Sequence, residues 1–135
     1  MPLDIVLSVN SEAAIWNEHT SISFGGNDAD YSFLWPTMIQ EIKNQTGELL
    51  DLYDDAEFSV DDLHKLESIV IKYVEYLRDT KEAIWDVSIG TQLGPVKNEI
   101  FRPLVKTDLV NKLEKFLHTV RLAKERKEKI ICLGD

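Results

Sequence analysis

The chain has a single cysteine, Cys132, so it cannot form an internal disulfide or a cysteine-based metal cage. It also lacks any apolar run approaching the ~20 residues that a membrane-spanning helix needs. Its start, Met1-Pro2-Leu3-Asp4, does not have the basic segment and long apolar stretch of a secretory signal peptide. These absences predict a cytoplasmic protein that does not associate with membranes.

Lysine and arginine are absent from residues 44–64, where seven carboxylates stand. The first 96 residues hold 18 acidic and 5 basic residues, and the remaining 39 hold 6 and 10. The two parts therefore carry net charges of −13 and +4. A field of one sign attracts a partner of opposite charge and repels nucleic acid. We expect a basic protein partner and no nucleic-acid binding.

Four segments have the pattern of β-strands. Alternate residues from Leu3 to Val9 form one apolar face, and short apolar or β-branched runs follow at residues 20–24, 83–89 and 129–133. Glycine and proline predict a loop over residues 90–96. The last strand would expose its Ile and Leu side chains unless it joined a sheet, so both terminal strands are expected to pair.

Two long helices are predicted, over about residues 60–79 and 108–127. Each has an apolar stripe at helical spacing, with Ser59 and Thr107 as the expected N-caps. A shorter helix is expected over 36–45, with its proline in the first turn. The pattern leaves residues 49–53 undecided between helix and extended chain. Together the elements predict an α+β fold: one domain, residues 1–135, with a mostly antiparallel sheet and both long helices on one face.

The acidic run at residues 44–64 has three interpretations. Its spacing does not match the EF-hand loop, so a metal site is not predicted. The remaining two are a solvated loop and a surface for a basic partner. Helix N-terminal preference explains Asp61 and Asp62. The other carboxylates of the segment's centre have no such reason and are candidate partner-binding residues, namely Asp51, Asp54, Asp55 and Glu57.

Trp35 is the fifth candidate partner-binding residue. It precedes Pro36 in what the pattern indicates is a strand-to-helix connection, where an aromatic side chain can be exposed. Trp and Tyr dominate the energetics of many interfaces, although most such residues in a small domain fill its core.

His19 is the strongest candidate for catalysis, with Asp28 or Asp30 as partner. If the chain is extended there, Glu18 and His19 point to opposite sides and do not pair. Ser21 is a nearby hydroxyl, but no nucleophile-elbow motif surrounds it. No catalytic residue is therefore assigned.

The two other histidines, His64 and His118, lie at helical positions beside the apolar stripes. Zinc-binding histidines on a helix stand at i and i+4, and neither residue has such a companion. The sequence predicts no metal site and no cofactor.

The basic segment 121–129 is expected to be balanced within its own helix. Glu125 and Glu128 stand at pairing distance from Arg121 and Lys124. Cations in the last turn also suit the negative end of the helix dipole. The segment therefore needs no nucleic acid to explain it.

The opening Met1-Pro2-Leu3-Asp4-Ile5-Val6-Leu7 and the later Tyr31-Ser32-Phe33-Leu34-Trp35-Pro36 resemble segments of small bacterial and phage proteins. Those proteins begin with a Leu-Asp-Ile or Leu-Asp-Val strand and carry a Leu-Trp-Arg-Pro segment, whose Arg is missing here. The resemblance covers about a quarter of the chain and implies no activity. In size and acidity the chain is also similar to immunity proteins, which neutralise bacterial toxins.

Three functional hypotheses follow. The first is an acidic interaction protein, most concretely an immunity-type inhibitor that binds a basic toxin such as a nuclease through its carboxylates. The second is a small hydrolase-like enzyme that uses His19 with nearby carboxylates. The third is a self-associating structural module of a phage or bacterial protein, in which the acidic face of one copy meets the basic helix of another in a homodimer.

Overall fold

The computed structural model describes residues 3–10, 12–25, 28–80, 82–92 and 98–134. Its elements in chain order are β1 (Leu3–Ser8), β2 (Ile22–Phe24), α1 (Ala29–Leu34), a π-helical segment (Trp35–Ile39), α2 (Gln40–Thr46), β3 (Ala56–Phe58), a 3-10 turn (Val60–Asp62), α3 (Leu63–Thr80), β4 (Ile84–Gln92), β5 (Asn98–Val105), α4 (Lys106–Arg126) and β6 (Lys129–Leu133). The predicted α+β fold is confirmed. In the part of the chain that is described, no helix combines the length and apolarity needed to cross a bilayer.

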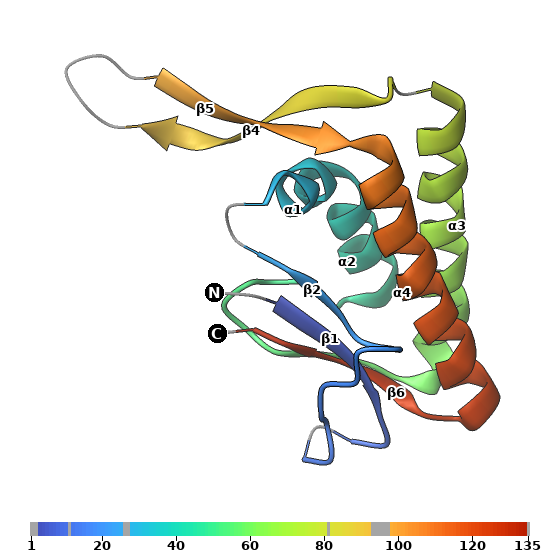
Figure 1. The fold of residues 1–135 in the computed structure, drawn as a ribbon. Coiled ribbons are helices and arrows are strands. Elements are labelled where there is room, and N and C mark those ends of the chain that lie inside the picture. The colour runs from blue at the N-terminus through green and yellow to red at the C-terminus, as the bar shows by residue number, and fades with distance from the viewer. Residues whose placement is uncertain (1–2, 11, 26–27, 81, 93–97, 135) are drawn as a thin grey trace.

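The main sheet has four strands in the order β2-β1-β6-β3, and all its pairings are antiparallel. Its two central strands are the first and last of the chain, so both termini lie side by side (Figure 1). Val6 stands opposite Ile131 in this pairing. Burial of Ile130, Ile131 and Cys132 explains why the last strand joins the sheet.

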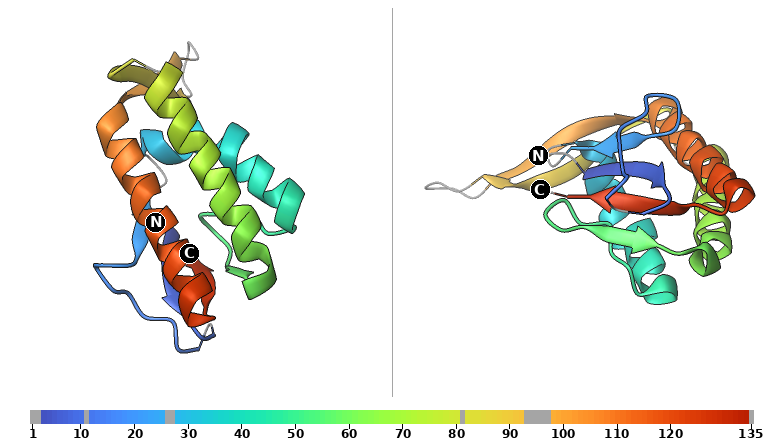
Figure 2. Two further views of the ribbon diagram at one scale, coloured as in Figure 1. Left: turned by 90° about the vertical axis from the view of Figure 1, so that its right-hand side faces the viewer. Right: turned by 90° about the horizontal axis from the view of Figure 1, so that it is seen from below.

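The two long helices run antiparallel and pack against each other along their length (Figure 2). Their predicted stripes form much of the single buried cluster, through Leu63, Leu66, Ile69, Val70, Val74 and Leu77 of α3 and Leu109, Val110, Leu113, Phe116, Leu117, Val120 and Ala123 of α4. This confirms the helical periodicity that the sequence shows.

The start of α4 differs from the prediction. The helix begins at Lys106, and its N-cap position is Val105, not Thr107. Strand β5 runs directly into the helix, and the Lys106 N–H donates to the Ala83 carbonyl at 2.8 Å. One of the unpaired N–H groups at the helix start is thus satisfied by the neighbouring strand, without a capping side chain.

The charges at the end of α4 are balanced between helices. The Arg121 Nε and Lys124 Nζ lie 3.2 and 2.9 Å from the carboxylate of Glu67 on α3. The predicted pairing with Glu125 and Glu128 is therefore wrong. The hydrogen bond from Lys124, followed by that from Arg121, holds the pKa of Glu67 below its usual value although partial burial opposes this.

Strands β4 and β5 form a separate two-stranded antiparallel sheet that lies over α1 and projects beyond the body (Figure 1). The predicted strand at 83–89 is confirmed, but the loop predicted over 90–96 is partly wrong, since β4 continues to Gln92. Gly90 (φ +154°) follows a bulge at Ser88 instead of ending the strand. Residues 93–96 of that loop lie outside the described residues.

Residues 29–46 form a continuous helical stretch with a π-helical segment in its middle. Pro36 was expected in the first turn, yet the helix already begins at Ala29. Proline has no N–H and its ring collides with the carbonyl four residues earlier, and a widened π turn accommodates both effects. The Thr37 hydroxyl donates to the Phe33 carbonyl at 3.2 Å, which offsets part of the lost bonding.

Candidate functional site

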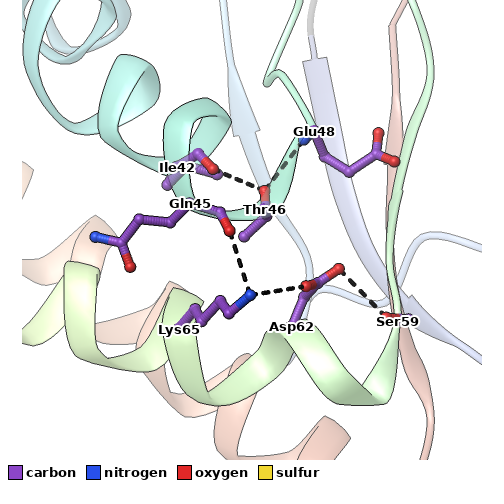
Figure 3. Close-up of polar contacts among 7 residues, drawn as sticks. All are labelled: Ile42, Gln45, Thr46, Glu48, Ser59, Asp62 and Lys65. Atoms are coloured by element: carbon purple, nitrogen blue, oxygen red, sulfur yellow. Dashed lines mark hydrogen bonds and ion pairs between the residues drawn. The ribbon is translucent and has the colours of Figure 1, made fainter.

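The segment of residues 48–57, hereafter the acidic loop, is held at its two ends by polar contacts (Figure 3). At its start, the Glu48 N–H donates to the Thr46 hydroxyl oxygen at 3.1 Å, and that hydroxyl donates to the Ile42 carbonyl at 2.7 Å. Beyond its end, Lys65 links the helices: its Nζ donates to the Gln45 carbonyl at 3.3 Å and lies 3.9 Å from Asp62. Gly47 makes the reversal with a left-handed φ of +82°.

Three carboxylates of the acidic loop accept backbone N–H groups. Asp51 Oδ1 accepts the Tyr53 N–H at 2.9 Å, and Asp54 Oδ1 accepts the Asp55 N–H at 2.9 Å. Asp55 Oδ1 in turn accepts the Gly134 N–H at 3.0 Å. Turn-stabilising bonds of this kind favour Asp. They give these residues the structural reason that the sequence did not reveal, but they neutralise no charge.

Gly134 sets the path of the acidic loop past the end of β6. A Cβ at this position would lie 2.5 Å from the backbone N and O of Asp54 and 2.8 Å from the Asp51 carbonyl oxygen. Only glycine allows the two segments to approach so closely. The chain end and the acidic loop are thus fitted to each other.

Glu57 differs from the three aspartates. It stands on β3 opposite Ile131, and its Oε1 lies 2.5 Å from the Nζ of Lys129 on β6. This cross-strand ion pair compensates its charge. Glu57 therefore supports the sheet. Among the described residues, the carboxylates of the acidic loop without an ion pair are Glu48, Asp51, Asp54 and Asp55, and the three aspartates are the predicted partner-binding residues among them.

A hollow of about 440 Å³ lies where the acidic loop meets α1 and β4. Eight described residues line it, and Asp51 is the one charged residue among them. Most of the rest are aromatic or aliphatic, including Tyr31, Trp35, Leu52, Tyr53 and Ile89. The structure thus brings together two of the five predicted partner-binding residues, Asp51 and Trp35.

The aromatic rings of the hollow are partly accessible. Trp35 is 39% exposed and Tyr53 is 70% exposed, whereas Tyr31 is buried. The rings of Tyr31 and Trp35 are 5.9 Å apart between centroids and tilted by 39°. One π-helical residue, Trp35, and one loop residue, Tyr53, therefore present ring surface to solvent beside a carboxylate.

Tyr31 forms the fixed part of the hollow. Its hydroxyl donates to the Leu50 carbonyl at 2.8 Å, which ties α1 to the acidic loop. Burial, followed by the negative charge of Asp51, raises the pKa of Tyr31 to about 12. The phenol is therefore neutral at physiological pH.

His19 lies on an exposed turn, with its side chain 84% exposed. Its Nε2 is 3.8 Å from Glu18, so the prediction that these two side chains do not pair is wrong, because residues 18–20 form a turn and not a strand. Within the described residues, no hydrogen bond or ion pair joins His19 to the other proposed catalytic groups. Asp28 accepts the Gly25 N–H at 2.9 Å, and Asp30 is paired with Lys112.

The remaining candidates show no functional grouping. His64 and His118 are both exposed, and across the described ranges no three metal-binding side chains lie together. Cys132 is fully buried in β6, and burial, with smaller contributions from Glu48 and Asp55, raises the pKa of its thiol well above the usual range. Such a thiol is unreactive in the folded protein.

Sequence reasoning named Asp51 and Trp35 but missed Tyr31, Tyr53 and Ile89. The adjacency of Tyr53 to Asp51 and Asp54 is a signal that could have identified it, since an aromatic ring among carboxylates in a loop is seldom buried. Comparison with models of known protein families, with curated proteins and with solved structures found no match.

Proposed function

We propose that this protein binds a basic protein partner through the acidic loop. In its most concrete form it is an immunity-type inhibitor whose carboxylates occupy the positive groove of a toxin such as a nuclease. The observation that carries the proposal is that Asp51, Asp54 and Asp55 have no ion pair within the described residues. Their charge is therefore available to a partner.

The mechanism is electrostatic attraction followed by local docking. Uncompensated surface charge of one sign raises the association rate with an oppositely charged protein by about 10- to 1,000-fold. The Asp54 carboxylate accepts the Asp55 N–H and the Asp55 carboxylate accepts the Gly134 N–H, so both carboxylates are held in place before binding. Such preorganisation lowers the conformational entropy lost on association.

The test starts from capture of binding proteins from the native host at low salt. The association rate of a captured basic protein is then measured against ionic strength. We expect the rate to fall at least about tenfold between low and physiological salt, and the variant Asp54→Lys with Asp55→Lys to lower it further.

The matched control is Glu75→Lys with Asp79→Lys, which makes the same charge change at two exposed residues of α3. It should reduce the rate much less, because the new charges lie on another element. The proposal is wrong if the two double variants have equal rates, or if the captured proteins are not basic.

The other two hypotheses gain no support of this kind. The homodimer requires free cations at the end of α4. Two of the basic residues there, Arg121 and Lys124, already contact Glu67. This leaves Arg126 and Lys127, which are exposed. The hydrolase requires His19 beside Asp28 or Asp30, and both carboxylates have other partners.

A further inference from the structure

The hollow beside the acidic loop has a lining that selects among ligands. Aromatic faces from Trp35 and Tyr53 attract cations through their ring quadrupoles, and Asp51 adds one full negative charge. Its volume of about 440 Å³ falls within the range of ligand pockets, ~300–1,000 Å³. An anion would meet Asp51, and none of the described residues of the lining is a cation that could balance it. The ligand chemistry is therefore cationic.

The state of the Asp51 carboxylate supports a charged ligand. One of its oxygens accepts the Tyr53 N–H, and within the described residues the other has no hydrogen bond. The first bond fixes the carboxylate relative to the backbone of Tyr53, whose ring lines the same hollow. The second oxygen can accept an N–H from a ligand that lies against that ring.

We propose that this hollow takes an arginine side chain of the protein partner, with the guanidinium against the aromatic rings and one N–H donated to Asp51. Arginine has a planar, weakly hydrated cation that stacks on aromatic faces and donates to carboxylates in its own plane. A lysine ammonium is compact and strongly hydrated, so it loses more solvation in a hollow that is mostly apolar. The inference rests on the proposed function, because it names the partner group that one part of the same surface recognises.

The experiment titrates the full chain with a small probe, N-acetyl-arginine N-methylamide. The same blocked amides of lysine and of citrulline, the neutral isostere of arginine, serve as comparisons. Binding is followed by the indole N–H signals in two-dimensional NMR, and Trp35→Phe assigns the Trp35 signal among the three tryptophans. We expect a saturable shift of the Trp35 signal in the millimolar range, with binding at least about fivefold weaker for lysine and citrulline.

Two substitutions separate the contributions of charge and ring. Asp51→Asn removes the charge but keeps the oxygen that accepts the Tyr53 N–H, so the loop is preserved, and we expect Kd to rise about fivefold or more. Tyr53→Ala changes an exposed side chain and is expected to raise Kd about threefold. Asp79→Asn removes an exposed carboxylate from α3 and is the control that should leave Kd unchanged.

Equal shifts from the arginine and citrulline amides would overturn the inference, as would a Kd for Asp51→Asn equal to that of Asp79→Asn. Stronger binding of the lysine amide would also overturn it. These results are independent of the partner experiment. If Asp54 and Asp55 control the association of a basic protein while the arginine amide leaves Trp35 unshifted, the proposed function stands and this inference fails. If the amide binds and no basic protein does, the hollow recognises the arginine group but the proposed function fails, and with it the assignment of that arginine to a protein partner.

Discussion

Four carboxylates on the helical side of the molecule pair with cations from other elements, whereas the acidic loop bonds three of its carboxylates to backbone N–H groups. The acids paired across elements on the helical side are Asp30, Glu41, Glu67 and Glu114. A cross-element pair fixes how two elements lie and compensates charge. A bond to a backbone N–H holds the carboxylate within a turn, as for Asp51 and Asp54, or against the chain end, as for Asp55, and the charge remains. Acidic residues therefore stabilise the arrangement of the elements on the helical side, whereas the negative charge of the three aspartates in the acidic loop remains uncompensated.

The largest effect is expected from the pair that joins Asp30 to Lys112. The Asp30 side chain is only 11% exposed, and Lys112 also donates to the Ser23 carbonyl at 3.0 Å. Lys112→Ala would leave a largely buried carboxylate without its cation. We expect a loss of about 3 kcal/mol in the free energy of unfolding, measured by urea denaturation.

The control for this variant removes both charges together. Asp30→Asn with Lys112→Met keeps most of the volume and retains an apolar stem near the Phe24 ring, which Lys112 Nζ approaches to 4.9 Å. Because no unpaired charge remains, this double variant should recover much of the stability lost in Lys112→Ala. If Lys112→Ala costs less than about 1 kcal/mol, the Asp30–Lys112 pair contributes no more than an exposed ion pair does. Cross-element pairing would then stabilise the helical side less than we expect.

A smaller effect is expected where the chain end contacts the acidic loop. In Gly134→Ala the new methyl group would meet the Asp54 backbone, which cannot move aside as a flexible side chain can. We expect a loss of about 1 kcal/mol by urea denaturation, together with changed NMR shifts of the Asp54 and Asp55 amides. Unchanged amide shifts would mean that the chain end moves away from the acidic loop, and that hydrogen bonds within the loop are enough to fix its conformation.

The pair around Glu67 gives a pH-dependent test. Its pKa is lowered in the folded state, so its contribution is complete above the ordinary carboxyl pKa and is lost as the pH falls through the lower folded value. Its partners are half exposed, so solvent screening limits the effect: Glu67→Gln should lose about 0.5–1 kcal/mol at pH 7.

Urea denaturation at pH 7 and again in strong acid checks this prediction, and the difference from the parent protein should shrink at the lower pH. Glu75→Gln is the matched control, because Glu75 is an exposed acid of the same helix with no ion pair within the described residues. A difference that persists in strong acid would show that Glu67 stabilises the helix pair through packing instead of charge.

The sequence correctly predicted the elements whose apolar residues are also the ones that the structure buries. The stripes of α3 and α4 and the strand β1 were found because each repeats its apolar side chains with the period of its own structure, and β6 was found as a short apolar run at the end of the chain. Pro36 and Gly90 misled the prediction, since local breaker signals were overridden by packing. The π turn accommodates Pro36 within a continuous helical stretch, and the bulge between Ser88 and Gly90 lets β4 continue past Gly90.

The candidate site was only partly predictable. Charge alone pointed to Asp51, Asp54, Asp55 and Glu57, of which Glu57 is paired with Lys129, and aromatic character pointed to Trp35. The grouping of Asp51 with Trp35 could not be read from the chain, because residues of β4 complete the hollow and the Tyr31 hydroxyl joins α1 to the acidic loop at the Leu50 carbonyl. Long-range contacts of this kind leave no local signature in one sequence.

The smallest effect is expected from the acidic loop itself. The triple variant Asp51→Asn, Asp54→Asn and Asp55→Asn keeps each oxygen that accepts an N–H and removes three negative charges from a chain of net charge −9. We expect its free energy of unfolding to stay within about 0.5 kcal/mol of the parent value by urea denaturation. The matched triple variant on the helical side, Glu41→Gln, Glu67→Gln and Glu114→Gln, should instead lose about 1–2 kcal/mol, because it breaks four cross-element ion pairs, two of them at Glu67. Equal losses in the two variants would remove the distinction between the regions. A stable loop variant that no longer binds a basic partner would assign the charge of the acidic loop to binding and not to folding.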